Sequence, residues 1–244
     1  MISIINFFFQ YQKARNDFSL SLSHWEINEG ESVVFYGASG CGKSTLLKCI
    51  SGQILPQKGN IVVCGKDVTQ LNDEQRRFHR LSNIGIVFQD YPLIPYLNAI
   101  QNVLLPFRIH PNLRLEEQNI EYAKHLLESL GLSNKETRLP QDLSQGERQR
   151  VAICRALIVK PKILLADEPI SSLDPKNSKR VMDDMLKINR EDGITIICNL
   201  HSLEIAKKYC DRLIGLSEGE VVFDGKPNEL TADISKKLYD LDDE

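Results

Sequence analysis

The chain has 244 residues, of which 42% are hydrophobic and 26% charged, so it is long enough for one large domain or two small ones with an ample core. Its formal net charge of −3 gives no general attraction to polyanions, and we expect no nucleic-acid partner. Six cysteines without a C-x-x-C pair or metal-ligand spacing predict reduced thiols in a cytosolic compartment. No apolar run approaches the roughly 18–20 residues that cross a bilayer, so any membrane role must depend on a partner.

The first third of the chain predicts β-strands that lead to a glycine-rich loop. Strand patterns cover residues 2–9 and 17–25 with a polar turn at 12–16 between them, and a turn at 28–31 precedes the apolar run 33–35. The loop that follows fits G-x-x-x-x-G-K-[ST], the pattern that cradles phosphates. An ordinary glycine turn is the alternative, but a strand directly before the pattern is the context that a phosphate loop requires.

Each residue type in this loop suits a triphosphate. Glycines let successive backbone N–H groups approach the phosphate oxygens, Lys43 brings a positive charge to the β- and γ-phosphates, and Ser44 supplies a hydroxyl for Mg²⁺. A helix that begins here and ends at Gly52 directs the positive end of its dipole at the anion. We therefore predict nucleotide binding by Gly37, Ser39, Gly40, Cys41, Gly42, Lys43, Ser44 and Thr45.

Two residues outside the loop are weaker candidates. Tyr11 lies 26 residues before Gly37, where an aromatic ring suits either stacking on a purine or simple packing.

Residues 59–67 predict a short antiparallel hairpin, and 84–88 predict a strand that ends at Gln89. Because ligands of open α/β sheets bind at the carboxyl edge of the strands, Gln89 is a candidate to reach the metal and the attacking water.

The pattern of prolines and apolar residues in 91–142 differs from that in the rest of the chain. Four prolines separate short helices, and one helical stripe, Ile120, Ala123, Leu127 and Leu130, is closed by Gly131. We interpret this segment as a helical insertion into the sheet domain, with most of its apolar residues packed in a core. The apolar residues of 91–96 follow Gln89 directly and are expected to form an exposed patch that docks a partner: Tyr91, Leu93, Ile94 and Tyr96.

A helix start at Ser144 has two interpretations. Ser144 and Glu147 satisfy S-x-x-E, so the plain interpretation is a capping box. A capped helix start is also an anion site, and the local sequence alone does not choose between them.

The run 163–168 adds two acids to a buried strand. Four consecutive apolar residues are typical of a strand buried on both faces of a parallel sheet. Adjacent carboxylates at its end would be costly unless they met a cation or a water. We predict that Asp167 holds Mg²⁺ and that Glu168 polarises the water attacking the γ-phosphate, against the alternative of an exposed strand end.

The last third continues the alternation of helices and strands. Asp174 is expected to cap a helix that starts at Pro175 and ends at Gly193, and 194–198 predicts a buried strand followed by His201. A lone histidine is usually structural, but beside the two acids His201 is a candidate γ-phosphate contact. Residues 213–216 and 221–223 predict a closing hairpin, and the acidic tail from 240 is expected to fray.

These motifs together resemble the ATPase domain of an ABC transporter, over essentially the whole chain. The phosphate loop, Gln89, the Leu-Ser-x-Gly-x helix start at 143–147, the strand end at 167–168, the turn at 172–174 and His201 occur in the order of that family. The resemblance implies that two such domains enclose two ATP molecules with Mg²⁺, and that Tyr11 stacks on adenine. It further implies that Ser144 and Gly146 of one subunit contact the γ-phosphate bound at the other subunit's Lys43. Glu147 and Asp174 are expected to belong to the cofactor-binding residues as well.

The family resemblance also implies a fold and a division of the chain. The expected fold is α/β, a P-loop NTPase of the ABC type with a mostly parallel sheet core, an antiparallel β-subdomain and a helical subdomain insertion. Residues 1–244 would form a single ABC ATPase domain, with 1–90 and 160–244 as the RecA-like core and β-subdomain, and 91–159 as the helical signature subdomain.

Within the family, different parts of the chain resemble different members. The last third is similar to ATP-binding subunits of phosphonate or phosphite importers, whereas residues 102–106 and 146–150 are similar to lipoprotein-releasing and macrolide-export ATPases. Gln145 stands where the family signature more usually has glycine. The resemblance implies an ATPase, as a homodimer or paired subunit, bound peripherally to integral membrane permease subunits at the cytoplasmic face, most closely a phosphonate-type importer with a solute-binding protein. An export-type ATPase and a soluble ABC ATPase such as an iron–sulfur assembly scaffold remain alternatives.

Overall fold

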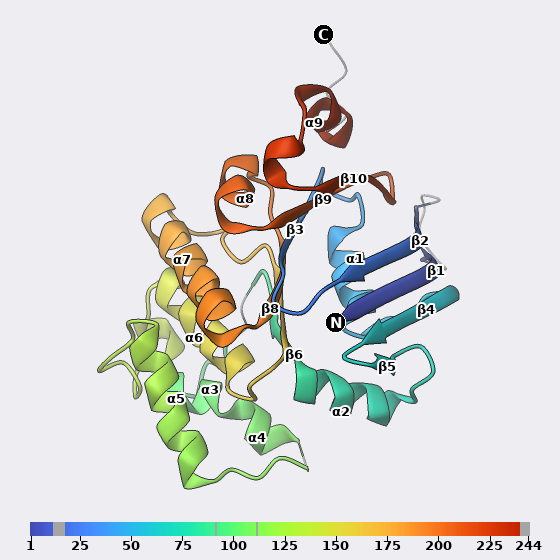
Figure 1. Ribbon diagram of the computed structural model, residues 1–244. Coiled ribbons are helices and arrows are strands. Elements are labelled where there is room, and N and C mark those ends of the chain that lie inside the picture. The colour runs from blue at the N-terminus through green and yellow to red at the C-terminus, as the bar shows by residue number, and fades with distance from the viewer. Residues whose placement is uncertain (12–17, 91, 111, 240–244) are drawn as a thin grey trace.

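The computed structural model describes residues 1–11, 18–90, 92–110 and 112–239, which form two β-sheets and their flanking helices (Figure 1). The larger sheet has the strand order β10-β9-β3-β8-β7-β6. Adjacent strands of this sheet run parallel, except that β10 runs antiparallel to β9. The strands are β3 (Ser32–Tyr36), β6 (Ile84–Val87), β7 (Ile163–Asp167), β8 (Thr195–Asn199), β9 (Arg212–Ser217) and β10 (Glu220–Gly225).

The smaller sheet is antiparallel and has the order β2-β1-β4-β5. It consists of β1 (Ile2–Gln10), β2 (Ser19–Ile27), β4 (Lys58–Val63) and β5 (Lys66–Asp67). Figure 1 shows it together with α1 (Lys43–Ile50) on one side of the larger sheet, while α6 (Gln145–Leu157) and α7 (Pro175–Asp192) cover the other side.

Side chains of the central strands alternate between two hydrophobic cores. Val33, Phe35 and Leu165 face the core shared with α1 and the antiparallel sheet. Val34 and Leu164 face the core shared with the long helices. Because a strand buried on both faces needs apolar residues at every position, the uninterrupted apolar runs of the sequence correspond to central strands.

The remaining helices connect or flank these layers. They are α2 (Asp73–Asn83), α3 (Ala99–Val103), α4 (Leu105–Ile109), α5 (Glu117–Ser129), α8 (Leu203–Tyr209) and α9 (Ala232–Tyr239), with 3-10 turns at Pro140–Asp142 and Pro227–Glu229. Within the described ranges, no helix is long and apolar enough to cross a membrane.

The strand predictions are confirmed to within two residues, and the predicted helices starting near residues 43, 144 and 175 are present. The predicted turn at 12–16 and the acidic tail from 240 lie outside the described residues. The sequence interpretation missed three helices, α2, α8 and α9. A capping box between Asn72 and Gln75 starts α2, and Ser202 caps α8, so both helices carried a local start signal.

The helical segment after β6 contains the expected stripe and corrects the expected patch. Ala123 and Leu127 are buried on α5, and Gly131 follows with a left-handed φ of +67°. Of the proposed 91–96 patch, Tyr91 lies outside the described residues, and Leu93 packs against the core instead of facing solvent. Asn102 Oδ1 accepts a hydrogen bond from the backbone N–H of Ile94 at 2.8 Å. Of the three described patch residues, Tyr96, which is 79% exposed, has the predicted exposure, and docking of a partner there stays a prediction.

Candidate active site

The phosphate loop joins β3 to α1, and two of its glycines are required by close approach. A Cβ on Gly37 would lie 2.1 Å from the carbonyl oxygen of Leu216 on β9. A Cβ on Gly42 would lie 2.9 Å from the ring of Phe18, and its φ is +111°. Larger residues at either position would therefore push the loop away from the sheet edge.

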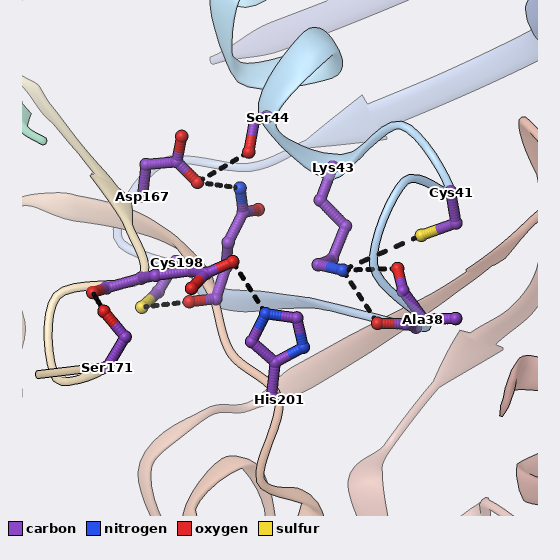
Figure 2. A network of polar contacts seen from close by, with 11 residues as sticks. Ala38, Cys41, Lys43, Ser44, Asp167, Ser171, Cys198 and His201 are labelled. Carbon is purple, nitrogen blue, oxygen red and sulfur yellow. Dashed lines mark hydrogen bonds and ion pairs between the residues drawn. The ribbon is translucent and has the colours of Figure 1, made fainter. Parts of the chain in front are cut away.

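Lys43 folds back over this loop. Its ammonium donates hydrogen bonds to the carbonyl oxygens of Gly37 at 2.7 Å and Ala38 at 2.8 Å, as Figure 2 shows. The side chain is only 5% exposed, so the charge is held within the loop instead of in bulk water. Gly42, the residue before α1, supplies no side-chain cap. The first N–H groups of α1 and the Lys43 ammonium thus converge on one place, which suits an anion.

Asp167 lies beside Ser44, at the end of β7. The Ser44 hydroxyl donates to Asp167 Oδ1 at 2.9 Å, and the amide of Asn199 donates to the same oxygen at 2.6 Å. Asp167 and Asn199 are direct partners in the parallel pairing of β7 with β8. A hydroxyl and a carboxylate held together are the hard oxygen donors that Mg²⁺ prefers next to phosphate oxygens. The donor set therefore fits Mg²⁺.

Glu168 follows with an unusual backbone. Its φ of +49° is left-handed, and its carbonyl accepts hydrogen bonds from the Ser171 N–H at 3.3 Å and the Ser171 hydroxyl at 3.1 Å. This turn directs the carboxylate to His201, whose Nε2 lies 2.6 Å from Oε1 (Figure 2). Strained backbone of this kind persists where the surroundings enforce it, often at functional sites.

A cavity of about 350 Å³ unites these groups. The hydroxyl of Tyr11 lies 3.2 Å from Thr45 Oγ1, and its ring packs edge-on against Phe9 at 4.8 Å between centroids. Tyr11 therefore lies at the cavity wall, with its ring restrained. The lining consists of Tyr11, Phe18, Ser39, Gly40, Gly42, Lys43, Ser44, Thr45 and Glu168.

The second predicted helix start, at α6, is arranged differently. Ser144 and Glu147 form the predicted capping box, and Lys135 forms an ion pair with Glu147. Partial burial alone would raise the pKa of Glu147, but the hydrogen bonds from Lys135 and Ser144 outweigh it and lower that pKa. A Cβ on Gly146 would lie 2.6 Å from the side chain of Asn177, so the helix start packs against the start of α7.

Asp174 is connected to the start of α6 through Asn177. Its carboxylate accepts hydrogen bonds from the backbone N–H of Asn177 at 3.0 Å and from the Asn177 amide at 2.5 Å. These bonds lower the pKa of Asp174. Asn177 thus links the turn at Asp174 to the start of α6 at Gly146.

The structure therefore divides the predicted site residues into two sets. One cavity is lined by Tyr11, Glu168 and most of the predicted phosphate-loop residues, and Asp167 and His201 are bonded directly to members of that set. Gly37 and Cys41 belong to the loop but do not line the cavity. The second set does not line that cavity in this chain: Ser144, Gly146, Glu147 and Asp174. Gln89 also lies outside its lining, exposed in the turn after β6. Sequence reasoning missed Asn199, although a polar residue closing a buried strand was a readable signal.

A nucleotide-binding loop after β3 at the carboxyl edge of a parallel sheet, with paired acids at the end of β7 on the far side of β8, defines a P-loop NTPase. A profile of the ABC transporter family matches residues 20–171, more than half of the chain. The chain belongs to the ABC transporter family as an ATP-binding subunit, and it is an ATPase.

Relatives agree with this assignment over most of the chain. The phosphonates import ATP-binding protein PhnC 2 of Oceanobacillus iheyensis is 46% identical over 88% of this chain and 87% of its own length. A phosphonates import ATP-binding protein of Bradyrhizobium diazoefficiens is 43% identical over 89% of this chain and 83% of its own length.

Solved structures agree as well. The dimeric structure of a bacterial ABC transporter cassette has a TM-score of 0.84 and 34% identity, covering 94% of this chain and 100% of the cassette. A cassette of Clostridium perfringens described as part of an ABC transporter complex also has a TM-score of 0.84, with 30% identity and coverage of 93% and 89%. The predicted ABC-type fold is therefore confirmed.

Proposed function

We propose that the chain hydrolyses ATP with Mg²⁺ and that two copies close on the nucleotide to drive phosphonate import through membrane permease subunits. The observation that carries the hydrolytic part is the cavity where Lys43, Ser44 and Glu168 meet. Lys43 and the N–H groups at the start of α1 bind the phosphates, and Ser44 with Asp167 would hold Mg²⁺. When bound there, the metal neutralises charge that develops on the phosphate oxygens during transfer.

Glu168 is the proposed general base. The short contact between His201 Nε2 and Glu168 Oε1 fixes the direction of the carboxylate at the cavity wall. A carboxylate so oriented accepts a proton from the attacking water, and His201 then contacts the γ-phosphate. Gln89 is proposed to join this group from β6, because β6 and β7 are parallel neighbours and Val87 is paired with Ala166.

The second set of residues is proposed to act across a dimer. Ser144 is exposed at the start of α6, and with Gly146, Glu147 and Asp174 it lies away from the chain's own phosphate loop. Two copies in head-to-tail order would bring this set of one copy to the nucleotide held by the other. A related bacterial cassette solved as a dimer supports this arrangement.

A groove beside the site is proposed to receive the membrane permease. It has a volume of about 640 Å³ and lies between β6, α4 and α6. Its apolar lining includes Phe88, which precedes Gln89 directly, and Ile109, which is 66% exposed. Exposed apolar grooves of this kind are interaction sites, and the neighbouring Gln89 offers a route to the nucleotide.

The division of the chain follows from these roles. We propose a single ABC ATPase domain over 1–244, in which 1–90 and 160–244 are the core with the β-subdomain, and 91–159 is the helical signature subdomain. The similarity to phosphonate import proteins supports import, with a solute-binding protein as a further partner and the ATPase at the cytoplasmic face of the membrane.

The transport proposal is tested in a bacterial strain whose growth on methylphosphonate as its phosphorus source depends on this chain. A Glu168→Gln variant expressed at the same level should fail to support growth, while growth on inorganic phosphate should be unchanged. Equal growth of the variant on methylphosphonate would refute the proposed coupling of hydrolysis to import.

A further inference from the structure

Asn199 occupies an unusual position for an amide side chain. It closes β8 after four buried residues and is itself 0% exposed. A buried amide costs free energy unless its polar atoms are bonded, so this residue needs a reason to be there.

The contacts of Asn199 point to the carboxylate of Asp167. Its Nδ2 donates to Asp167 Oδ1 at 2.6 Å, the same oxygen that receives the Ser44 hydroxyl at 2.9 Å. The pairing of Asp167 with Asn199 across β7 and β8 fixes both backbones, so the two side chains meet without a long flexible arm. Asn199 thus restrains the carboxylate from the side of the sheet, and Ser44 restrains it from the side of the phosphate loop.

The bonding of this amide is incomplete. Asn199 Oδ1 has no hydrogen-bond partner within the described part of the chain. A leucine side chain has nearly the same shape and would avoid this unbonded oxygen, so packing alone favours leucine. The bond to Asp167 is the one contact that explains the amide.

We propose that Asn199 is a positioning residue for the metal site: it holds the Asp167 carboxylate turned toward Ser44, so that Mg²⁺ binds with the nucleotide. The inference rests on the proposed use of Asp167 and Ser44 as the Mg²⁺ site. A hydrogen bond from a fixed donor restricts the rotamer of a carboxylate, and outer-shell partners of this kind tune metal affinity.

The chain contains a matched control. Asn189 on α7 is also buried, at 3% exposure, and its Oδ1 is likewise without a partner in the described ranges. Its Nδ2 donates to two backbone carbonyls, of Gly30 and Ile194, each at 2.9 Å. Asn189 therefore has a structural role in a turn, without a contact to a site residue.

The experiment compares Asn199→Leu and Asn189→Leu in the full chain. We measure Mn²⁺ binding to the ADP complex by electron paramagnetic resonance, the Mg²⁺ concentration for half-maximal ATPase activity, and the melting temperature. Asn199→Leu should weaken Mn²⁺ binding and raise the Mg²⁺ requirement by about 10- to 100-fold. ADP affinity in EDTA should stay within about twofold. Asn189→Leu should lower the melting temperature and leave metal binding unchanged.

Two results would overturn the inference. One is an Asn199→Leu variant that loses thermal stability yet binds Mn²⁺ as the wild type does; the other is an equal loss of metal binding in Asn189→Leu. If Asn199→Leu does not fold, Asn199→Ala, which introduces no added bulk, is measured with the same expectation. A wild-type protein without any Mg²⁺ dependence would instead refute the proposed function, so the two failures are distinguishable.

Discussion

The starts of α1 and α6 are both helix ends that attract anions, but the first N–H groups of the two helices have different partners. The first N–H groups of α1 meet no side-chain cap, and Lys43 adds a charge to them. At α6, the side chains of Ser144 and Glu147 already occupy the capping positions. We therefore infer that the first helix start can bind phosphate within one copy, whereas the second has two of its donors satisfied by its capping box and offers an exposed hydroxyl.

The two helix starts therefore have different proposed roles in nucleotide binding. We propose that a phosphate bound at α1 receives hydrogen bonds from backbone N–H groups and from the Lys43 ammonium, which are strong because they are charge-assisted. At α6, we expect only the Ser144 side chain to contribute to nucleotide binding, with Gly146 allowing the helix to approach the phosphate. We therefore expect changes at α1 to remove nucleotide binding, and changes at α6 to affect only the step that needs a second copy.

We expect substitution of Lys43 to have the strongest effect on nucleotide binding. Lys43→Ala should raise the dissociation constant of ATP by about 10²-fold or more, because two charged hydrogen bonds to phosphate are each worth roughly 1.5–3 kcal/mol. Equilibrium binding of a fluorescent ATP analogue measures this. Lys48→Ala, an exposed lysine on the same helix, should bind normally. Retained affinity in Lys43→Ala would contradict the phosphate-loop assignment.

Glu168 provides the next largest effect. Glu168→Gln should keep ATP binding and lower turnover by about 10²–10⁴-fold, the usual contribution of a general base. Phosphate release assays measure it, with Glu204→Gln on α8 as a control that removes an exposed carboxylate elsewhere. Turnover within tenfold of the wild type would exclude Glu168 as the base.

A smaller effect is expected at the other helix start. Ser144→Ala should lower turnover by roughly 10- to 100-fold through one lost contact to a charged phosphate, and leave ATP binding to a single copy unchanged. It should also cost about 1 kcal/mol of folding stability by removing a cap. Asn72→Ala, which uncaps α2, is the control: similar stability loss with normal turnover. Equal turnover in both variants would mean that Ser144 is only a cap.

A still weaker effect, on folding stability alone, is expected at Asp184 on α7, the helix that packs against α6. Burial raises the pKa of Asp184 on α7 to about 6, and Arg150 on α6 partly offsets this. Because the folded state holds the proton more tightly than the unfolded chain, this group's contribution to stability falls as pH rises from about 4 to about 6. Asp184→Asn should remove that fall. Urea unfolding across this range tests it, and a pH-independent difference between the two proteins would contradict it.

The sequence was sufficient for the parts of the fold set by apolar runs. The central strands are uninterrupted runs of apolar residues, and α5 has its stripe at Ala123 and Leu127. Helix α2 was missed because His79 is its single buried residue, so it has no apolar stripe to detect. Helix α8 is only seven residues long, which is too short for helical periodicity.

Motifs in the sequence indicated candidate site residues but not the contacts between them. Motif order alone indicated Lys43, Asp167 and Glu168, because each is fixed by neighbours close in sequence. The bond from Asn199 to Asp167 joins residues 32 positions apart and depends on the register of β7 against β8. The strained backbone at Glu168 likewise follows from the turn stabilised by Ser171. No local sequence pattern predicted that turn.

The central claim is that nucleotide is enclosed between two copies of this chain. It is tested most directly by sedimentation equilibrium of the Glu168→Gln protein with ATP and Mg²⁺, with Ser144→Arg added in a second sample. We expect a dimer with ATP, a monomer with ADP, and a monomer in the Ser144→Arg sample. A Glu168→Gln protein that binds ATP yet stays monomeric at high concentration, with or without its permease, would contradict it.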